Sequence, residues 1–235
     1  MVPIKEALTF DDVTLAPKYS EILPSQVDTS IKITNNLQLK VPLLSSAMDT
    51  ITESKMAIAV AKAGGLGIIH RNLNIKEQIL EIKKVKKKKL LVGAAVGAGA
   101  NEFKRAEEIL KEKIDMIVVD TAHGHTKKVS DIIKFIKKKK NKKTALCAGN
   151  IATSEAAKFL LKLGVDIIKV GIGPGSICTT RLVAGIGVPQ LSAILSVRNG
   201  IKNKNIKIIS DGGIKYSGDL AKAFAAGADA VMIGS

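Results

Sequence analysis

Short apolar runs rich in β-branched residues alternate along the chain with longer stretches whose apolar residues recur at helical spacing. Eight of the short runs predict strands: Val41–Met48, Leu66–His70, Leu91–Val96, Met116–Asp120, Thr144–Asn150, Ile167–Gly171, Lys207–Asp211 and Ala230–Ser235. Seven stretches between them predict helices, several of which begin with Ser, Thr or Asn as an N-cap: Glu53–Ala63, Ile75–Val85, Asn101–Lys111, Thr126–Lys138, Ser154–Leu163, Gln190–Asn199 and Ser217–Ala226.

Strict strand–helix alternation predicts parallel strands joined by right-handed crossovers, and eight such units close into a TIM (β/α)8 barrel. A doubly wound open sheet is the alternative. Polar residues at the strand ends favour the barrel, because the catalytic groups of barrels gather at the C-terminal ends of the strands. We expect one rim to collect Ser45, Ser46, Met48, Asp49, Asp120, Asn150, Gly171–Cys178, Asp211–Gly213 and Gly234–Ser235.

Length and composition indicate one domain. The chain has 235 residues, of which 46% are hydrophobic, enough for one substantial core. Its 20 glycines and 6 prolines are scattered, so no stretch resembles a linker. We therefore expect residues 1–235 to form a single barrel domain, with Met1–Lys40 covering its bottom or side.

The formal net charge of +16 raises the question of nucleic-acid binding. Much of this charge lies in two lysine runs, Lys83–Lys89 and Lys137–Lys143, which follow predicted helices and precede predicted strands. Lysines are favoured at helix C-termini by the helix dipole. Only 3% of residues are aromatic and none is Trp, which leaves little to stack on bases. The pattern favours a lysine-rich solvated surface over a nucleic-acid site.

The sequence gives no sign of a membrane or secretory segment. No apolar run approaches the roughly 20 residues of a membrane helix, and the N-terminus lacks the pattern of a signal peptide. The two cysteines, Cys147 and Cys178, lie in different predicted elements, which fits a reducing compartment. We expect a soluble, cytoplasmic protein.

The segment Lys169–Arg181 places three glycines before a serine and a cysteine. Glycines let the backbone approach a ligand closely. Hydroxyl residues surround Cys178, and no apolar periodicity runs through Gly173–Thr180, so Cys178 is a candidate nucleophile. A buried, unreactive cysteine is the alternative. Cys147 lies in an apolar strand and is expected in the core.

Glycines also end the last two predicted strands. Asp211-Gly212-Gly213 follows the seventh strand and Gly234-Ser235 ends the eighth. Backbone amides at these positions of a barrel predict a phosphate cradle, and a carboxylate beside it suits the two hydroxyl donors of a ribose. The alternative is a plain turn capped by Asp211.

Two further segments resemble a metal-binding motif and a dinucleotide-binding motif, but each lacks an element that its motif requires. His123 and His125 suggest a metal, but no third histidine is near, and catalytic zinc normally takes three protein ligands. Asp120, a carboxylate ending a strand, is the better functional candidate there. The glycines of Gly93–Ala100 do not have the Gly-x-Gly-x-x-Gly spacing of a dinucleotide fingerprint, so they predict a strand end and a tight loop.

Several motifs together resemble one enzyme family over nearly the whole chain. The motifs are Ser45–Thr50, Gly149-Asn150, Gly171–Arg181, Val183–Gln190, Asp211–Gly213 and Met232–Ser235. In order and spacing they are similar to the inosine-5′-monophosphate (IMP) dehydrogenase family, which shares its cysteine loop with the guanosine-monophosphate (GMP) reductases.

The resemblance implies a two-step reaction in guanine nucleotide biosynthesis. The Cys178 thiolate would add to C2 of the hypoxanthine ring, hydride would pass to NAD, and water would hydrolyse the adduct to xanthosine monophosphate (XMP). Thr180 would help to position or deprotonate that water.

The same resemblance assigns the binding residues. IMP would contact Ser46, Met48, Asn150, Ser176, Asp211, Gly212, Gly213, Gly234 and Ser235, with Asp211 at the ribose. NAD would contact Asp120, Thr121, Gly171 and Gly173. A potassium ion would bind the carbonyls of Gly173, Gly175 and Cys178 together with a neighbouring subunit's C-terminal segment, since the family usually forms homotetramers.

Two departures from the family pattern leave other functions open. A pair of regulatory nucleotide-binding (CBS) modules usually follows the second helix, whereas no such insertion stands near residues 85–90. The family's flap with its Arg-Tyr pair would lie beyond Ser235, which puts the hydrolysis step in question. GMP reductase, which lacks the regulatory pair, is the alternative enzyme, and a nucleotide-binding barrel without catalysis is the alternative outside enzymes.

Overall fold

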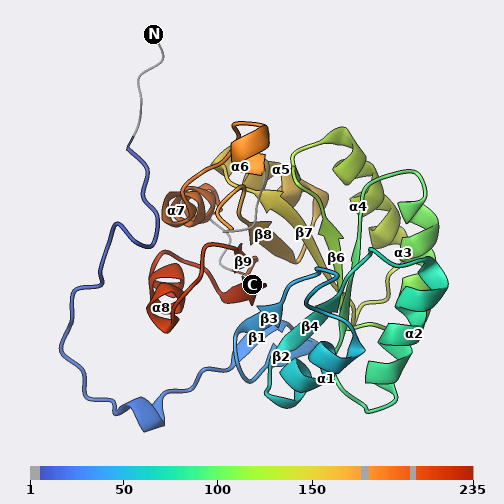
Figure 1. Cartoon of the computed structure of the whole chain (residues 1–235), viewed down its shortest axis with the longest axis horizontal. Helices are drawn as coiled ribbons and strands as arrows, with labels where there is room; N and C mark the ends of the chain where they lie inside the picture. Colours follow the sequence, from blue (N-terminus) through green and yellow to red (C-terminus); the bar gives the residue numbers. More distant parts are fainter. Residues whose placement is uncertain (1–5, 176–179, 202–204, 235) are drawn as a thin grey trace.

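Eight parallel strands form a closed barrel, which confirms the predicted TIM (β/α)8 fold and excludes the open sheet (Figure 1). The structure is a computed structural model and describes residues 6–175, 180–201 and 205–234. The strands follow the order β10-β3-β4-β5-β6-β7-β8-β9 around the barrel. Their bounds are β3 (Leu43–Ser45), β4 (Leu66–Ile69), β5 (Gly93–Val96), β6 (Met116–Asp120), β7 (Ala145–Ile151), β8 (Ile167–Val170), β9 (Lys207–Asp211) and β10 (Ala230–Ile233).

Helices connect successive strands and cover the outside of the barrel (Figure 1). All seven predicted helices are present within a residue or two: α1 (Ser54–Lys62), α2 (Ile75–Lys86), α3 (Glu102–Lys111), α4 (Lys127–Lys139), α5 (Ser154–Leu163), α7 (Gln190–Gly200) and α8 (Ser217–Ala225). A short helix that was not predicted, α6 (Thr180–Val183), precedes α7. The first predicted strand was too long, because only Leu43–Ser45 pairs with its neighbours.

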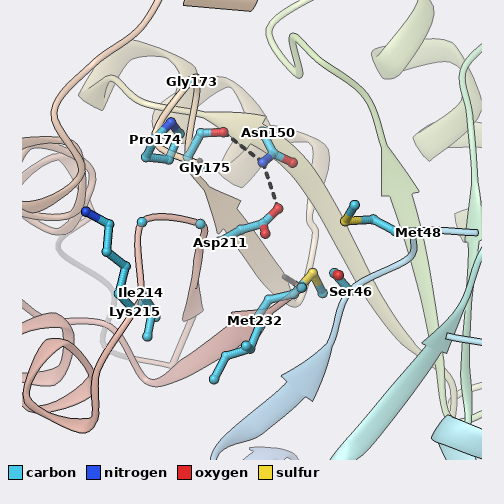
Figure 2. A pocket seen from close by; sticks show the side chains of 15 residues that line it. Ser46, Met48, Asn150, Gly173, Pro174, Gly175, Asp211, Ile214, Lys215 and Met232 are labelled. Atoms are coloured by element: carbon cyan, nitrogen blue, oxygen red, sulfur yellow. Dashed lines mark hydrogen bonds between the residues drawn. The ribbon is translucent and has the colours of Figure 1, made fainter. Parts of the chain in front are cut away.

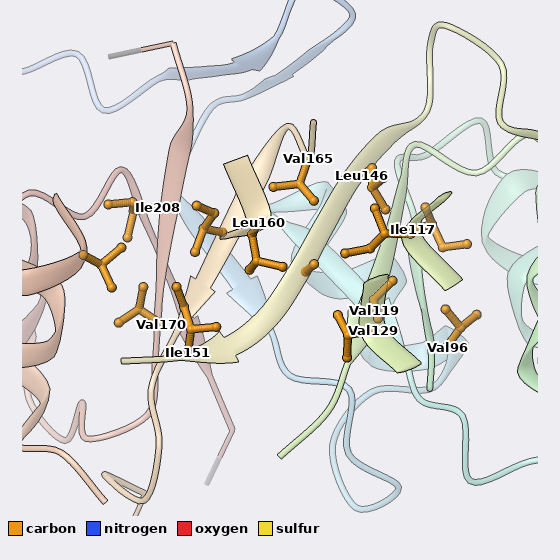
Figure 3. Close-up of a cluster of buried hydrophobic side chains, with 14 of the residues drawn as sticks. Val96, Ile117, Val119, Val129, Leu146, Ile151, Leu160, Val165, Val170 and Ile208 are labelled. Atoms are coloured by element: carbon orange, nitrogen blue, oxygen red, sulfur yellow. The ribbon is translucent and has the colours of Figure 1, made fainter. Parts of the chain in front are cut away.

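Alternation along the strands separates two apolar clusters. On β6, Ile117 and Val119 belong to the outer cluster together with helix residues such as Val129 and Leu160 (Figure 3). Met116 and Val118 belong instead to a second cluster inside the barrel. This two-residue period sends every second side chain of a strand to the barrel interior.

A hairpin closes the barrel at the N-terminal ends of the strands. It consists of β1 (Ile31–Thr34) and β2 (Leu37–Leu39), which pair antiparallel. Ile33, Leu37 and Leu39 are buried in the interior cluster. The β1–β2 hairpin thus covers the bottom of the barrel, through strands that the sequence analysis did not predict, whereas residues 14–30 before it are exposed.

Both lysine runs lie where the sequence places them. Lys83, Lys84 and Lys86 form the last turn of α2, and Lys137–Lys139 form that of α4. The positive charge therefore sits at helix C-termini, where the helix dipole stabilises it. Within the described ranges, no helix has the length and apolar character needed to span a membrane.

Candidate active site

A cavity of about 200 Å³ opens at the C-terminal ends of the strands (Figure 2). We call it the Ser46 cavity. Residues from five separate parts of the sequence converge on it, as predicted for the catalytic rim. Those that the sequence analysis had singled out are Ser46, Met48, Asn150, Gly171, Gly173, Gly175, Asp211, Gly212, Gly213 and Gly234.

The loop after β3 meets the end of β10 at this cavity. The Ser46 amide donates to the Ile233 carbonyl at 3.0 Å. The Ser46 hydroxyl is buried and has no hydrogen-bond partner among the described residues. A methyl group on Gly234 would lie 2.8 Å from Ser46 Oγ and 3.1 Å from Met48 Sδ, so a side chain there would force both of these groups to move. A buried, unpaired hydroxyl facing an open cradle is a group that a bound ligand would satisfy.

The turn after β9 forms another wall of the cavity. Gly212 and Gly213 have φ angles of 93° and 78°, which side-chain-bearing residues rarely adopt. Gln190, at the start of α7, fixes this turn by donating to the carbonyls of Val170 (2.9 Å) and Asp211 (3.3 Å). Backbone groups at this turn therefore face the cavity without an intervening side chain.

Lys215 also lines the Ser46 cavity and was not predicted (Figure 2). Its ammonium lies 3.3 Å from Asp11 Oδ2 on the exposed side. It brings positive charge to the glycine turn, which suits an anionic ligand.

A second cavity, of about 260 Å³, adjoins the first, and we call it the Asp120 cavity. Asp120, Thr121, Gly171 and Gly173, the four residues assigned to NAD by resemblance, all line it. Four residues border both cavities: Asn150, Gly171, Gly173 and Asp211. The two cavities are thus two parts of one site.

A buried lysine joins the polar residues between the cavities. Lys169 is 3% exposed and faces the barrel interior from β8. Its ammonium lies 2.8 Å from Asp120 Oδ1 and 2.5 Å from Asp211 Oδ2, and it also donates to Asn150 Oδ1. Asn150 Nδ2 donates in turn to Asp211 Oδ2 and to the Gly171 carbonyl, both at 2.8 Å. The network holds three side chains that the sequence analysis had treated separately.

Electrostatics keep this network charged. Burial alone would lower the pKa of Lys169, but Asp120 and Asp211 outweigh it and raise that pKa well above its usual 10.5. Burial likewise tends to raise the pKa of Asp120, whereas the charges of Lys169 and Arg71 lower it below its usual 3.8. Lys169 is therefore a cation and Asp120 an anion near neutral pH.

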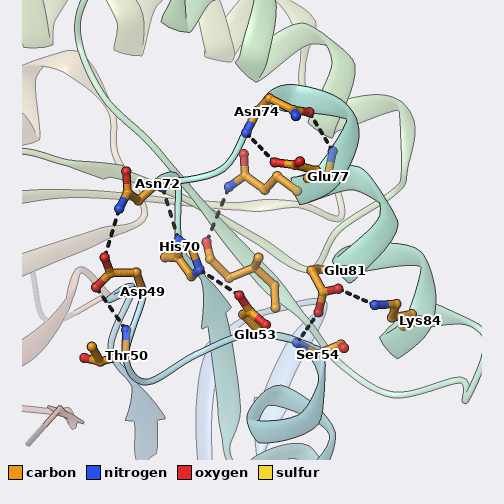
Figure 4. Close-up of polar contacts among 12 residues, drawn as sticks. Asp49, Thr50, Glu53, Ser54, His70, Asn72, Asn74, Glu77, Glu81 and Lys84 are labelled. Carbon is orange, nitrogen blue, oxygen red and sulfur yellow. Dashed lines mark hydrogen bonds and ion pairs between the residues drawn. The ribbon is translucent and has the colours of Figure 1, made fainter.

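Polar contacts brace the loop that carries Met48 (Figure 4). Asp49 Oδ2 accepts from Asn72 Nδ2 at 2.9 Å, and His70 Nδ1 accepts from the Asn72 amide at 3.1 Å. The other His70 nitrogen lies 3.5 Å from the Glu53 carboxylate. The loop after β4 thereby supports the loop after β3.

The two histidines that suggested a metal lie near an aromatic ring. The His125 ring packs on the Phe159 ring, with 4.7 Å between centroids, and the His123 ring lies 6.4 Å from that of His125. The described part of the chain contains no group of three or more His, Cys, Asp or Glu side chains placed to hold a metal. Cys147 is fully buried, as expected, and burial raises the pKa of its thiol to about 12.

Several predicted residues lie outside the described ranges. These are Ser176, Cys178 and Ser235. Thr180 begins α6. Gly171, Gly173 and Gly175, which line the Ser46 cavity, precede the cysteine segment in the chain.

The sequence held a signal for Lys169 that the analysis missed. β8 contains a single charged residue among apolar ones, and the two-residue period points Lys169 to the same side as Ile167, into the barrel. The same period points Asp120 and Asp211 inward. A buried charge needs partners, so these three residues could have been grouped. Arg71, which lines the Asp120 cavity, follows β4 and carried no comparable signal.

Comparison with known proteins shows the family of this chain. The family described as "IMP dehydrogenase / GMP reductase domain" matches residues 7–235. The chain belongs to this family. It is 47% identical to the inosine-5′-monophosphate dehydrogenase of Borreliella burgdorferi, 44% identical to that of Cryptosporidium parvum and 35% identical to that of Aquifex aeolicus.

These matches cover nearly all of this chain and part of each relative. The aligned region takes in 98%, 99% and 99% of the chain and 69%, 68% and 73% of the three relatives, respectively. The alignments run over 281, 275 and 360 positions. Because the chain has 235 residues, each relative carries residues within the aligned span that have no counterpart here.

Proposed function

We propose that this protein is an NAD-dependent IMP dehydrogenase that oxidises IMP to XMP through a covalent bond to Cys178. One observation carries the proposal: the described residues that the family pattern assigns to IMP all line the Ser46 cavity. The names of the relatives support IMP as the substrate. The family match alone would also allow a GMP reductase.

The Ser46 cavity suits a purine nucleotide. Met48 and Met232 supply an apolar wall for the base, and the Ser46 hydroxyl is free to bond with a ligand. Asp211 would accept from both ribose hydroxyls. Amides of the glycine turn and of Gly234, with Ser176 and Ser235, would hold the phosphate, helped by the charge of Lys215.

The Asp120 cavity fits the nicotinamide riboside of NAD. The Asp120 carboxylate is about 29% exposed there, which leaves it able to accept hydrogen bonds from ribose hydroxyls. The Thr121 hydroxyl donates to the Gly149 carbonyl at 2.8 Å and so fixes the rim. When bound, NAD would accept the hydride released from C2. Gly171 and Gly173 would let its ring approach the nucleotide, because both border the two cavities.

Cys178 would carry the covalent step. Its thiolate sulfur adds to C2 of IMP, and the C2 hydrogen then leaves with its electron pair as hydride, which leaves a thioimidate between C2 and sulfur. Water adds to C2, loses a proton with the help of Thr180, and displaces the thiolate. The products are XMP, reduced cofactor and one proton, so the reaction balances.

A potassium ion fits the donor set proposed for it. The carbonyls of Gly173, Gly175 and Cys178 are hard, uncharged oxygens of the kind that bind this ion. The further ligands would come from a neighbouring subunit of a homotetramer. The bound potassium ion and its ligands would hold the cysteine segment in position for attack on C2.

Steady-state assays with two substrate pairs test the proposal. The purified chain is incubated with IMP and NAD, and in parallel with GMP and NADPH, while reduced nicotinamide is followed by absorbance. We expect NADH to form with IMP and no NADPH to be consumed with GMP. Consumption of NADPH with GMP would assign the chain to the reductase. No change in absorbance with either substrate pair, together with measurable IMP binding, would favour a nucleotide-binding barrel without catalysis.

A further inference from the structure

We propose that Lys169 is a positioning residue shared by the two halves of the site, which holds Asp211 in place for the nucleotide and Asp120 in place for the dinucleotide. The inference rests on the proposed function and goes beyond it, since neither the family pattern nor the motifs assign a role to this lysine. It follows from where the ammonium lies and from what it contacts.

The geometry leaves the ammonium no donor for a ligand. A lysine ammonium has three N–H groups, and three acceptors surround this one: Asp120 Oδ1, Asp211 Oδ2 and Asn150 Oδ1. The side chain is only 4% exposed. Lys169 therefore acts on a ligand through the two carboxylates.

One of the two carboxylates lines the Ser46 cavity and the other does not. Asp211 borders both cavities, whereas Asp120 borders the Asp120 cavity alone. Asp120 ends β6 and Asp211 ends β9, so neither backbone fixes the other. Lys169, from β8, contacts both carboxylates and so links them. Asn150, from β7, contacts both Lys169 and Asp211.

Charge balance makes the lysine necessary. The ammonium is surrounded by the carboxylates of Asp120 and Asp211 and by the Asn150 amide. The positive charge of the Arg71 guanidinium also acts on Asp120. Without the ammonium, two carboxylates that now share one cation would repel each other inside the barrel. Both would move or one would bind a proton, and each subsite would lose its preorganised acceptor.

Four variants of the full chain separate this role from simple packing. Lys169→Met keeps an unbranched apolar side chain and removes the charge, while Lys169→Arg keeps the charge. Asp120→Asn removes one carboxylate, and Lys169→Met/Asp120→Asn removes the cation together with that carboxylate. The dissociation constant for IMP is measured by calorimetry, the KM for NAD by steady-state assay, and folding by circular dichroism.

We expect Lys169→Met to weaken IMP binding by about tenfold or more and to raise the KM for NAD as well, because a buried charge loses its partner. Asp120→Asn should raise the KM for NAD and leave IMP binding within about twofold, since Lys169 still holds Asp211. The double variant should bind IMP more tightly than Lys169→Met, because the repulsion is gone. Lys169→Arg should recover part of both losses, because a guanidinium can span two carboxylates.

Improvement of IMP binding by a second substitution outside the Ser46 cavity is the decisive result. A packing role predicts no such recovery, so a double variant as weak as Lys169→Met would overturn the inference, as would Lys169→Met with unchanged IMP binding. If Lys169→Met does not fold, recovery of the folded chain in the double variant supports the inference, and no recovery overturns it. A wild-type chain that binds no IMP would instead overturn the proposed function and this inference with it.

Discussion

Gly234 tests the shape of the Ser46 cavity through a single methyl group. In Gly234→Ala the new Cβ would lie 2.8 Å from Ser46 Oγ and 3.1 Å from Met48 Sδ, closer than ordinary contact. Both neighbours are side chains that can rotate. Moving them off their preferred rotamers costs about 0.5–1.5 kcal/mol of folding free energy, and turning the Ser46 hydroxyl away from a ligand costs about 0.5–1.5 kcal/mol of binding free energy.

The binding cost corresponds to a loss of IMP affinity between about twofold and 13-fold. The rotamer strain is already present in the free variant, so it lowers the stability of the fold instead. We therefore expect the midpoint of thermal unfolding to fall by less than about 6 °C. Calorimetric titration with IMP and a thermal melt measure the two quantities on the same preparation.

Gly218→Ala is the matched control. A Cβ on Gly218 meets nothing within 4 Å, and the residue lies in the first turn of α8, away from the cavity. This change should leave IMP binding unaltered and stabilise the chain by about 0.5–1 kcal/mol. The reasoning about the cavity is refuted if Gly234→Ala binds IMP as tightly as Gly218→Ala does.

Three further predictions concern charge and reactivity. The pKa of Asp120 is lowered on folding, so its contribution to stability is complete above the unfolded pKa near 4 and is lost as the pH falls through the folded value. The unfolding free energy of the wild type should therefore fall more steeply from pH 5 to pH 3 than that of Asp120→Asn. Equal slopes for the two proteins would contradict this. Cys147 is buried with a thiol pKa of about 12, so a thiol reagent at pH 8 should label Cys178 and leave Cys147 unmodified. Peptide mapping identifies the labelled residue, and labelling of Cys147 in the folded chain would refute its burial. Because the lysine runs end α2 and α4, RNA binding in a salt titration should vanish near physiological ionic strength, and binding that survives would revive a nucleic-acid role.

The fold was predictable because its pattern is local and repeated. Each strand needs only a few apolar residues and each helix only an apolar face, and both periods are visible in the sequence. The C-terminal strand ends then meet at one rim by the geometry of the barrel. This is why Ser46, Asn150 and Asp211, far apart in the sequence, could be placed in one cavity.

What the sequence analysis missed depends on contacts between distant elements. The hairpin β1–β2 has strands of four and three residues, too short to show a period, and Leu37 and Leu39 are buried only because the barrel stands above them. The first strand was predicted too long because Val41–Met48 is apolar beyond the part that pairs. Lys169 gave a local signal, whereas its partners became evident only when the barrel closed.

Intact-mass analysis after acid quenching tests the central claim most directly. The wild-type chain is incubated with IMP and NAD beside Cys178→Ala, and the supernatant is analysed for XMP. The account predicts a nucleotide bound covalently to the wild-type chain, or XMP released from it, and neither with Cys178→Ala. An adduct or XMP that forms equally well without Cys178, or a wild-type chain that binds both ligands and yields neither, would contradict it.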